Sequence, residues 1–313
     1  MANYQIPSWV IFSIFAVLAS QYFSGSHSAS ILNSIAIAAL LAGSLRFVML
    51  IGELNFAIAA FVGIGAYSAG VATTMLDISF FLAILTSGVA ASLISMVFGS
   101  ITLRSGGPYF LLIGFAFTEA MRIVYSKTDV LGQTSGMVGI FPPIEFDDWL
   151  SLFVIIICLG LLFLMYVIEK SQFGTIFKSI RDNSDVTRTV GINVLYWKVV
   201  CFAIASFCAG IAGALQAFVN NVISPGDFGY LLAVFALAYV KVGGESSIAG
   251  SILGAIFLVV LSEFALALGA GEHIFYGAAI VIAVLFMREG IVGLVSSTIS
   301  WITKTRASKE ERV

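Results

Sequence analysis

Residues 169–198 read EKSQFGTIFKSIRDNSDVTRTVGINVLYWK and form a polar island between two long apolar stretches. Five of the 15 Lys and Arg residues of the chain fall within it. A basic loop between spans is the strongest sequence marker of the cytoplasmic face of a membrane protein. The island therefore predicts a cytoplasmic element that is large enough to bind a soluble partner.

The composition of the rest of the chain indicates a membrane solvent. Hydrophobic residues make up 60% of the 313 residues, charged residues make up 10%, and the mean hydropathy is +1.06. These values exclude an ordinary soluble domain. At about 20 residues per transmembrane helix, roughly nine to eleven helices account for the length, so residues 1–313 are predicted to form a single transmembrane domain. The three cysteines lie in apolar stretches, which is typical of buried packing residues.

Hydropathy predicts an all-α, polytopic membrane protein with about ten transmembrane segments. The predicted spans are 8–23, 30–51, 54–76, 79–102, 107–125, 149–168, 199–219, 229–241, 248–269 and 275–287. The first apolar run follows neither a basic region nor an A-x-A-like cleavage site, so we expect an uncleaved span rather than a signal peptide. With the island inside, alternation of the spans places both termini in the cytoplasm.

The charges agree with this arrangement. Twelve of the 15 basic residues fall on the inner side, and Arg46 lies near the inner end of its span. Only Arg122 and Lys127 lean outward, and the outer loop at 126–148 carries four acidic residues. This asymmetry is what the positive-inside rule requires.

Two spans look irregular. The segment at 229–241 is too short to cross about 30 Å at about 1.5 Å per residue. The span at 107–125 starts beside Gly106, Gly107 and Pro108, so we expect a non-helical start. Such backbone is tolerated at membrane depth only where protein or a water-filled cavity covers it, which predicts that both spans lie near the interior. Close helix packing is predicted at two groups of small residues, Gly63, Gly65 and Gly70, and Gly210, Gly213 and Ala214.

Within the island, residues 181–190 are expected to form a short helix with Val186 and Val190 on one face and charges on the other. Gly191 suits the left-handed position that ends such a helix. A helix at the membrane surface transmits the movement of a partner to the adjacent spans as a rigid body. A solvated basic loop without a partner is the alternative.

A family resemblance rests on ungapped positions of the island, namely Ser171, Phe173, Gly174, Ile180, Arg181, Asp182, Asn183, Gly191, Ile192, Asn193 and Lys198. The island resembles the EAA-type coupling loop of bacterial ABC importer permeases, most closely that of LivM-type permease subunits of branched-chain (hydrophobic) amino-acid importers. Thr175 stands where the family usually has a basic residue, and Ser184 where it usually has an acidic one. The resemblance implies that the ATPase is coupled through Arg181, Asp182, Asn183, Asp185, Gly191, Ile192 and Asn193.

The resemblance extends over nearly the whole chain. The segments LR-x-x-G-x-YF and LAFAE of the family are similar to the set Leu103, Arg104, Gly107, Tyr109, Phe110, Phe115, Ala116, Phe117 and Glu119. Its Gly-rich outer loop is similar to Gly132, Thr134, Gly136 and Gly139, with Ser135 in place of a usual glycine. Further similar positions are 209–215, 224–225 and 243–244.

No motif for energy conversion or catalysis is present. The sequence lacks the G-x-x-x-x-G-K-[ST] of a P-loop, as well as H-E-x-x-H, C-x-x-C and G-x-S-x-G. The two histidines, His27 and His273, stand singly in predicted outer loops. We therefore expect no catalytic residue, no metal and no cofactor, and if ATP drives the protein, a separate chain must bind it.

Polar residues within the spans are the remaining candidates for contact with a substrate. The candidate pathway or structural residues are Glu119, Arg122, Tyr109, Glu263 and Asn55. Glu119 and Arg122 are spaced i, i+3, so they either pair with one another or contact substrate. Glu263 has no charged partner nearby in the sequence. For Asn55, as for Asn33, a hydrogen bond between helices is the ordinary explanation.

Residues 288–313 follow the last predicted span. Their apolar residues fall on one side, with serines opposite and Trp301 ahead of a basic end. The pattern predicts a helix in the inner membrane interface, and it favours membrane anchoring over the docking of a partner.

Together these features predict a multi-pass permease subunit of an ABC importer in the bacterial plasma (inner) membrane. The resemblance implies cytoplasmic ATPase subunits, a second LivH-like permease and a periplasmic or lipid-anchored substrate-binding protein, with membrane lipid around the bundle and no nucleic acid. Branched-chain or other small amino acids are the leading substrates. Urea and short amides, and then sugars or nucleosides, are alternatives. An ion-coupled secondary transporter would need internal repeats and ion sites at broken helices, and the coupling-loop match argues against it.

Overall fold

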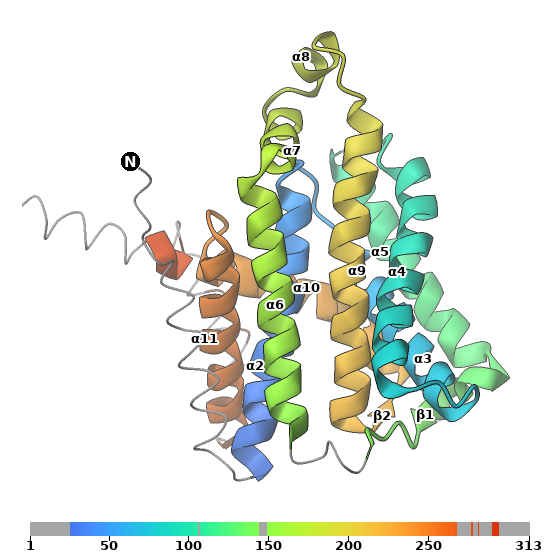
Figure 1. The fold of residues 1–313 in the computed structure, drawn as a ribbon. Coiled ribbons are helices and arrows are strands. Elements are labelled where there is room, and N and C mark those ends of the chain that lie inside the picture. The colour runs from blue at the N-terminus through green and yellow to red at the C-terminus, as the bar shows by residue number, and fades with distance from the viewer. Residues whose placement is uncertain are drawn as a thin grey trace, which may run out of the picture.

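The computed structural model describes residues 26–105, 107–143 and 149–267, together with 277, 281 and 290–293. Helices make up most of it (Figure 1). They are α2 (Ser26–Met49), α3 (Ile58–Thr74), α4 (Phe80–Thr102), α5 (Gly107–Lys127), α6 (Leu150–Lys170), α7 (Gln172–Asp182), α8 (Ser184–Thr189), α9 (Val194–Asn220), α10 (Tyr230–Gly243) and α11 (Ile248–Ala267). Apart from the isolated positions just named, the predicted spans at 8–23 and 275–287 and the tail at 288–313 lie outside the described residues.

The helices have the length and composition of membrane spans. Within the part of the chain that the structure describes, six helices are long and apolar enough to cross a membrane, and two shorter helices, α3 and α10, are also apolar. Eight of the ten predicted spans coincide with a helix. The protein is therefore a polytopic helical membrane protein. The total number of spans, and the side of the membrane on which the two termini lie, stay predictions.

The chain between α2 and α3 is not helical, and α3 begins four residues after the predicted start of a span at about residue 54. Gly52 has a φ of +81°, which only glycine adopts without strain. The Glu53 and Asn55 side chains that follow are buried. The Thr118 hydroxyl of α5 donates to the Phe56 carbonyl at 2.9 Å. Neighbouring protein thus covers part of this non-helical segment.

The predicted irregular spans, α10 and α5, differ from one another. α10 has 14 residues, about 21 Å at about 1.5 Å per residue, and is as short as predicted. It crosses behind α2 and α6 (Figure 1), and it packs against α2 and α11. α5, in contrast, is a continuous helix of 21 residues, and its first residue, Gly107, has a φ of +59°.

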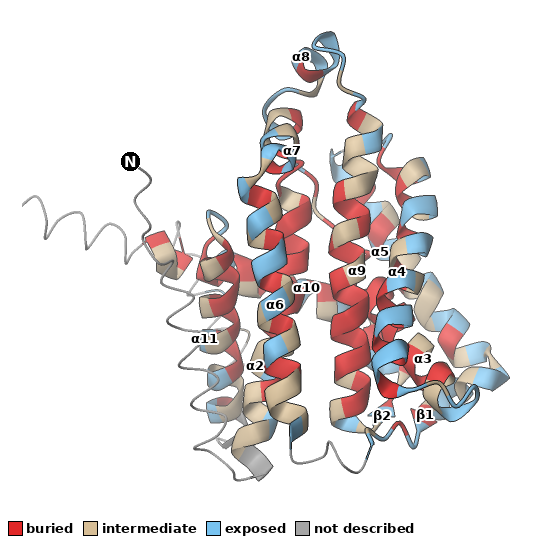
Figure 2. Cartoon of the chain, in the orientation of Figure 1, coloured by how far each residue is buried: buried red, intermediate tan, exposed pale blue. Residues whose placement is uncertain are grey.

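α9 is the central helix. It packs against α2, α3 and α4, and the half that lies toward β2 is largely buried (Figure 2). A Cβ added to Gly65 would lie 2.0 Å from the carbonyl oxygen of Gly210, and one added to Gly213 would lie 2.0 Å from that of Val62. The predicted packing of small residues therefore brings the backbones of α3 and α9 into contact.

The two ends of the bundle differ in structure. α7 and α8 lie at one end, whereas β1 (Met137–Val138) pairs antiparallel with β2 (Val222–Ile223) at the other (Figure 1). Short 3₁₀ helices stand next to these strands in the chain, η1 (Asp129–Leu131), η2 (Gln133–Ser135) and η4 (Pro225–Phe228). Gly136 has a φ of +76°, and an added Cβ would lie 2.0 Å from the Ile223 carbonyl oxygen, so this junction requires glycine.

Candidate coupling site and the polar face of α5

The polar island folds as two helices, so the single helix predicted over 181–190 is wrong. The break lies at Asn183, which has an extended backbone (φ −160°, ψ 102°). Its Oδ1 accepts hydrogen bonds from the backbone N–H groups of Asp185 and Val186 at 3.0 and 3.1 Å. An Asn side chain that caps the next helix competes with continuation of the preceding one. The cap therefore separates α7 from α8.

α7 is fixed to the bundle through its buried face. The Phe177 ring packs edge-on against Phe47 of α2, with ring centroids 5.8 Å apart, and against Trp197 of α9 at 6.3 Å. Gly174 lies against the end of α6, where an added Cβ would be 1.9 Å from the Glu169 carbonyl oxygen. α7 is thus in close contact with three of the spans.

α8 leaves more of its surface open. It is held by Thr187, whose buried hydroxyl donates to the Ser179 carbonyl at 3.0 Å. Val186, on α8, and Val190, the residue that follows α8, are 58% and 74% exposed, so both apolar side chains of the predicted face are open to a partner. Gly191 has a φ of +85°, which confirms the predicted left-handed position.

A buried charge network lies beneath α7. Arg46 of α2 donates through its two Nη atoms to the Glu169 carboxylate at 2.7 and 3.2 Å, and its Nε donates to the Glu245 carbonyl at 2.8 Å. The side chains of Arg46 and Glu169 are only 2% and 8% exposed. Lys178 of α7 also contacts Glu169, at 3.3 Å. One arginine thereby connects α2, the end of α6 and the turn between α10 and α11.

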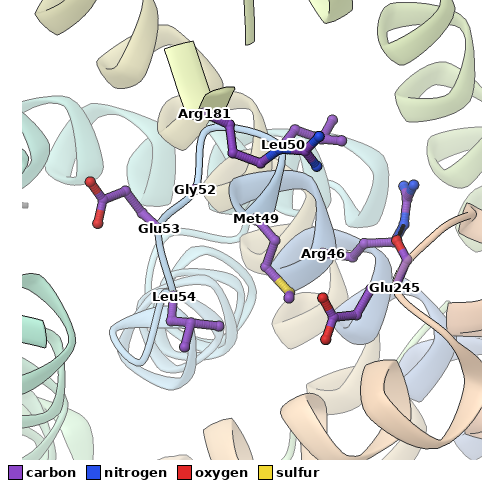
Figure 3. A pocket seen from close by; sticks show the side chains of 8 residues that line it. All are labelled: Arg46, Met49, Leu50, Gly52, Glu53, Leu54, Arg181 and Glu245. Carbon is purple, nitrogen blue, oxygen red and sulfur yellow. Dashed lines mark hydrogen bonds between the residues drawn. The ribbon is translucent and has the colours of Figure 1, made fainter. Parts of the chain in front are cut away.

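A cavity of about 230 Å³ opens beside this network (Figure 3). Its lining consists of Arg46, Met49, Leu50, Gly52, Glu53, Leu54, Arg181 and Glu245. Arg181 of α7 lies against the turn at Gly52, where an added Cβ would be 3.1 Å from the Arg181 Cγ. The cavity therefore joins the coupling helix to the non-helical segment before α3.

Glu53 connects further elements at the same end. Lys198 of α9 donates to its Oε1 at 2.6 Å, and the N–H of Gly107, the first residue of α5, donates to its Oε2 at 3.0 Å. Neither the pair of Glu53 and Lys198 nor the pair of Arg46 and Glu169 is predicted from the sequence. Their members lie 145 and 123 positions apart. Of the four residues, only Arg46 gives a signal in the sequence, as a charged residue within a predicted apolar span.

The seven predicted coupling residues gather at the α7–α8 end. Arg181 and Asp182 form an exposed ion pair at 3.3 Å. Asn183 caps α8, and Asn193 caps α9, where its Oδ1 accepts from the Tyr196 N–H at 3.1 Å, so both have a structural role. The remaining members are Asp185 and Gly191, which are exposed, and Ile192, which is half-buried.

The second group of predicted residues lies on α5. The Arg122 Nε donates to Glu119 Oε2 at 2.7 Å, so the i, i+3 ion pair is formed. The other carboxylate oxygen accepts from the backbone N–H of Tyr230, the first residue of α10, at 3.2 Å. The Glu119 and Arg122 side chains are 25% and 42% exposed. Tyr109, nearer the start of α5, is also exposed.

Comparison with known proteins decides the family. Residues 28–286 match the family described as the permease component of the branched-chain amino acid transport system. The chain belongs to this family.

The chain is similar to three curated permeases. It is 24% identical over 271 residues to LivM, the high-affinity branched-chain amino acid transport system permease of Escherichia coli strain K12, a match that covers 77% of this chain and 64% of LivM. It is 26% identical over 275 residues to the corresponding permease BraD of Pseudomonas aeruginosa, covering 78% and 87%. It is 24% identical over 266 residues to the ribose import permease RbsC of Haemophilus influenzae, covering 81% of each. The match thus spans just under two thirds of LivM. No solved structure matches the chain.

Membership of this permease family and the membrane-spanning helices confirm the predicted multi-pass location in the bacterial plasma membrane. The family consists of transport permeases rather than enzymes. In the part of the chain that the structure describes, no three His, Cys, Asp or Glu residues gather as a metal site would require.

The other polar residues predicted within the spans of this permease differ in their surroundings. Asn33 donates through Nδ2 to the Ser151 hydroxyl of α6 at 3.0 Å, which confirms a hydrogen bond between helices. For Asn55 that expectation is wrong, since neither amide atom has a hydrogen-bond partner among the described residues. Glu263 lies on α11 and is half-buried.

Proposed function

We propose that this chain is the permease subunit of an ABC importer, in which it forms part of the translocation pathway for branched-chain or other small amino acids. A separate ATPase chain docks on residues 169–198 and drives transport. The observation that carries the proposal is the α7–α8 element, which projects from the bundle with an open apolar face and exposed charges in a chain of a permease family (Figure 1). The sequence has no P-loop, so ATP hydrolysis belongs to another subunit.

The two island helices divide the work of coupling. α8 and the residue that follows it offer Val186 and Val190 as apolar anchors, each worth about 1.5–3 kcal/mol if a partner buries it fully. α7 transmits the movement, because Phe177 and the pair of Arg46 and Glu169 hold this region against α2, α6 and α9. Displacement of α7 therefore moves these helices together.

The exposed face of α5 supports a pathway at that surface. Glu119 lies 12 residues after Gly107, about 18 Å along the helix, and hence within a hydrocarbon core of about 30 Å. A partly exposed ion pair at that depth is costly against lipid, so it is expected to face a cavity or another chain. The pathway therefore runs along α5, and a second, LivH-like permease completes it.

The choice of substrate rests on the relatives and on this ion pair. LivM and BraD are named for branched-chain amino acid transport, and RbsC for ribose import. Glu119 and Arg122 offer one charge of each sign to a zwitterion, whereas ribose, urea and short amides carry no charge. Amino acids are therefore the first candidate. A ribose-like sugar is the second, on the strength of the RbsC match, and urea and short amides follow.

The same proposal assigns an orientation. The α7–α8 end faces the cytoplasm, where its basic residues satisfy the positive-inside rule. The β1–β2 end then faces outward, and there a periplasmic or lipid-anchored binding protein delivers the substrate.

A complex purified from its native membrane through a tag on this chain tests the proposal. We expect an ABC-type ATPase and a second permease to copurify. Proteoliposomes of that complex, supplied with the binding protein, should import L-leucine only when ATP is present. Import without ATP, or import of ribose in place of leucine, would contradict the proposed function.

A pair of variants tests the docking surface. Val190→Glu should abolish binding of the ATPase, because it places a charge in the apolar contact. Val138→Glu is the matched control, since Val138 is 67% exposed at the opposite end of the bundle, and it should leave binding intact. Equal binding by both variants would contradict docking on α8.

A further inference from the structure

Arg122 keeps most of its hydrogen-bonding capacity unused. Its Nε donates to Glu119, but within the described ranges neither Nη atom has a hydrogen-bond acceptor. A guanidinium carries five N–H donors in a planar fork whose geometry matches a carboxylate. The four donors on the two Nη atoms therefore remain for a further ligand.

This guanidinium is held in place rather than free to swing. Glu119 binds it through one carboxylate oxygen, and the other accepts the Tyr230 N–H, so α5 and the start of α10 position it together. The preceding turn η4 is fixed as well, since Asp227 Oδ2 accepts from the Ser224 N–H at 2.9 Å. A donor group that is already oriented loses less entropy on binding a ligand.

An apolar surface lies beside the ion pair. Phe115 stands seven residues before Arg122, so both lie on the same face of α5. The rings of Phe115 and Tyr230 are in contact, with centroids 5.4 Å apart, and both are partly exposed. The backbone of Tyr230 is bonded to Glu119. A guanidinium fork, a carboxylate and two aromatic rings thus stand together at the start of α10.

We propose that Arg122 binds the carboxylate of the transported substrate and thereby determines specificity within the pathway. Glu119 is the positioning residue that orients the fork, and the rings of Phe115 and Tyr230 receive an apolar side chain. This inference rests on the proposed function, since it places the substrate at the exposed face of α5. Arg122 thereby favours substrates that carry a carboxylate group over otherwise similar molecules that lack one.

Binding of radiolabelled L-leucine to the purified complex in nanodiscs, without the binding protein, tests this assignment. Competition by L-leucinamide, which keeps the ammonium group and the side chain but lacks the carboxylate, measures the selectivity. The native complex should favour leucine about tenfold or more, since a charge-assisted bidentate contact is worth at least that factor. Arg122→Gln should abolish the preference, and Arg122→Lys, which keeps the charge without the fork, should give an intermediate value. Lys127→Gln, an exposed position on the same helix, should behave as the native complex.

Glu119→Gln separates positioning from a merely structural role. Glutamine keeps an acceptor for the Tyr230 N–H but loses the charge that holds the Arg122 Nε. We expect a lower preference for leucine at unchanged thermal stability, whereas a structural role alone would lower the stability and leave the preference as it is.

Three results would overturn the assignment. In the first, the native and Arg122→Gln complexes show the same preference for leucine over leucinamide. In the second, the native complex binds no leucine. In the third, the Arg122→Gln complex loses the second permease but keeps its preference for leucine. Failure of the proposed function is a different observation, because the native complex with its binding protein would then show no ATP-driven import of leucine.

Discussion

Removing one member of the buried pair of Arg46 and Glu169 should destabilise the protein more than removing both. In Glu169→Leu, the Arg46 guanidinium is 2% exposed and, among the residues that the structure describes, keeps only the Glu245 carbonyl at 2.8 Å. A stranded buried charge costs about 3–5 kcal/mol. In Arg46→Met, the carboxylate of Glu169 keeps Lys178 at 3.3 Å. The loss of stability is therefore smaller than in Glu169→Leu, about 1.5–3 kcal/mol for the charge-assisted hydrogen bonds. The double variant buries apolar side chains instead and should cost about 1 kcal/mol or less.

Denaturant unfolding in detergent micelles, followed by tryptophan fluorescence, measures these three free energies. The double-mutant cycle should then give a coupling of several kcal/mol between Arg46 and Glu169. The exposed pair of Arg188 and Asp185, at 3.4 Å, is the control and should couple by less than about 1 kcal/mol. If the losses of the two single variants simply add in the double variant, the stranded charge is not the source of the cost and the reasoning is refuted.

Three further predictions concern the island, the orientation and the core. Gly191→Val should lower the stability of the fold by about 1–3 kcal/mol through backbone strain at a φ of +85°, since an added Cβ meets nothing within 4 Å. In this variant, ATP hydrolysis stimulated by the binding protein should fall while membrane insertion persists. With an impermeant thiol reagent, Ser184→Cys should be labelled only from the cytoplasm and Gln133→Cys only from outside, and the reverse pattern would invert the orientation. Gly213→Leu should lower thermal stability by at least about 1–3 kcal/mol, because its Cβ would lie 2.0 Å from a carbonyl oxygen of α3, whereas Gly160→Leu, with open space around it, should not.

Hydropathy predicts the described membrane helices well because the bilayer imposes both their length and their composition. The failures occur where a single polar side chain outweighs the local pattern. The amphipathic spacing over 181–190 favours one helix, but the Asn183 side chain binds two backbone N–H groups and starts a new one. Residues 54–57 are apolar enough to extend a span, yet Gly52 and the buried Glu53 direct the chain into a non-helical path.

The candidate sites divide in a similar way. The ion pair of Glu119 and Arg122 follows from helical periodicity, since residues three apart share a face. The partner of Arg46, by contrast, lies on another helix 123 positions away, and no local rule of spacing indicates it. The bond from Glu119 to the Tyr230 N–H depends on how α10 lies in the bundle, which a single sequence does not determine.

Two chains of contacts lead from the island to α5. One passes through Lys198 at the start of α9 to Glu53, whose second oxygen holds the N–H of Gly107. The other passes through Glu169 and Arg46 to the Glu245 carbonyl, and so to α10, whose first N–H binds Glu119. Both end on the helix that carries the proposed pathway face. Movement of α7 and α8 is therefore expected to reach α5 at its start and near its outer half.

Cutting these connections in turn tests whether they carry the coupling. Glu53→Gln keeps one acceptor for Gly107 but loses the charge that pairs with Lys198, so it should lower the leucine imported per ATP hydrolysed without preventing ATPase docking. Arg46→Met with Glu169→Leu removes the other connection at little cost in stability. Either route alone still reaches α5. The triple variant should therefore lower the leucine imported per ATP hydrolysed by far more than the Glu53→Gln variant and the Arg46→Met, Glu169→Leu variant do in sum, and import should become uncoupled from ATP hydrolysis. A triple variant that imports as much leucine per ATP as the native complex would show that neither charge pair transmits the movement of the island.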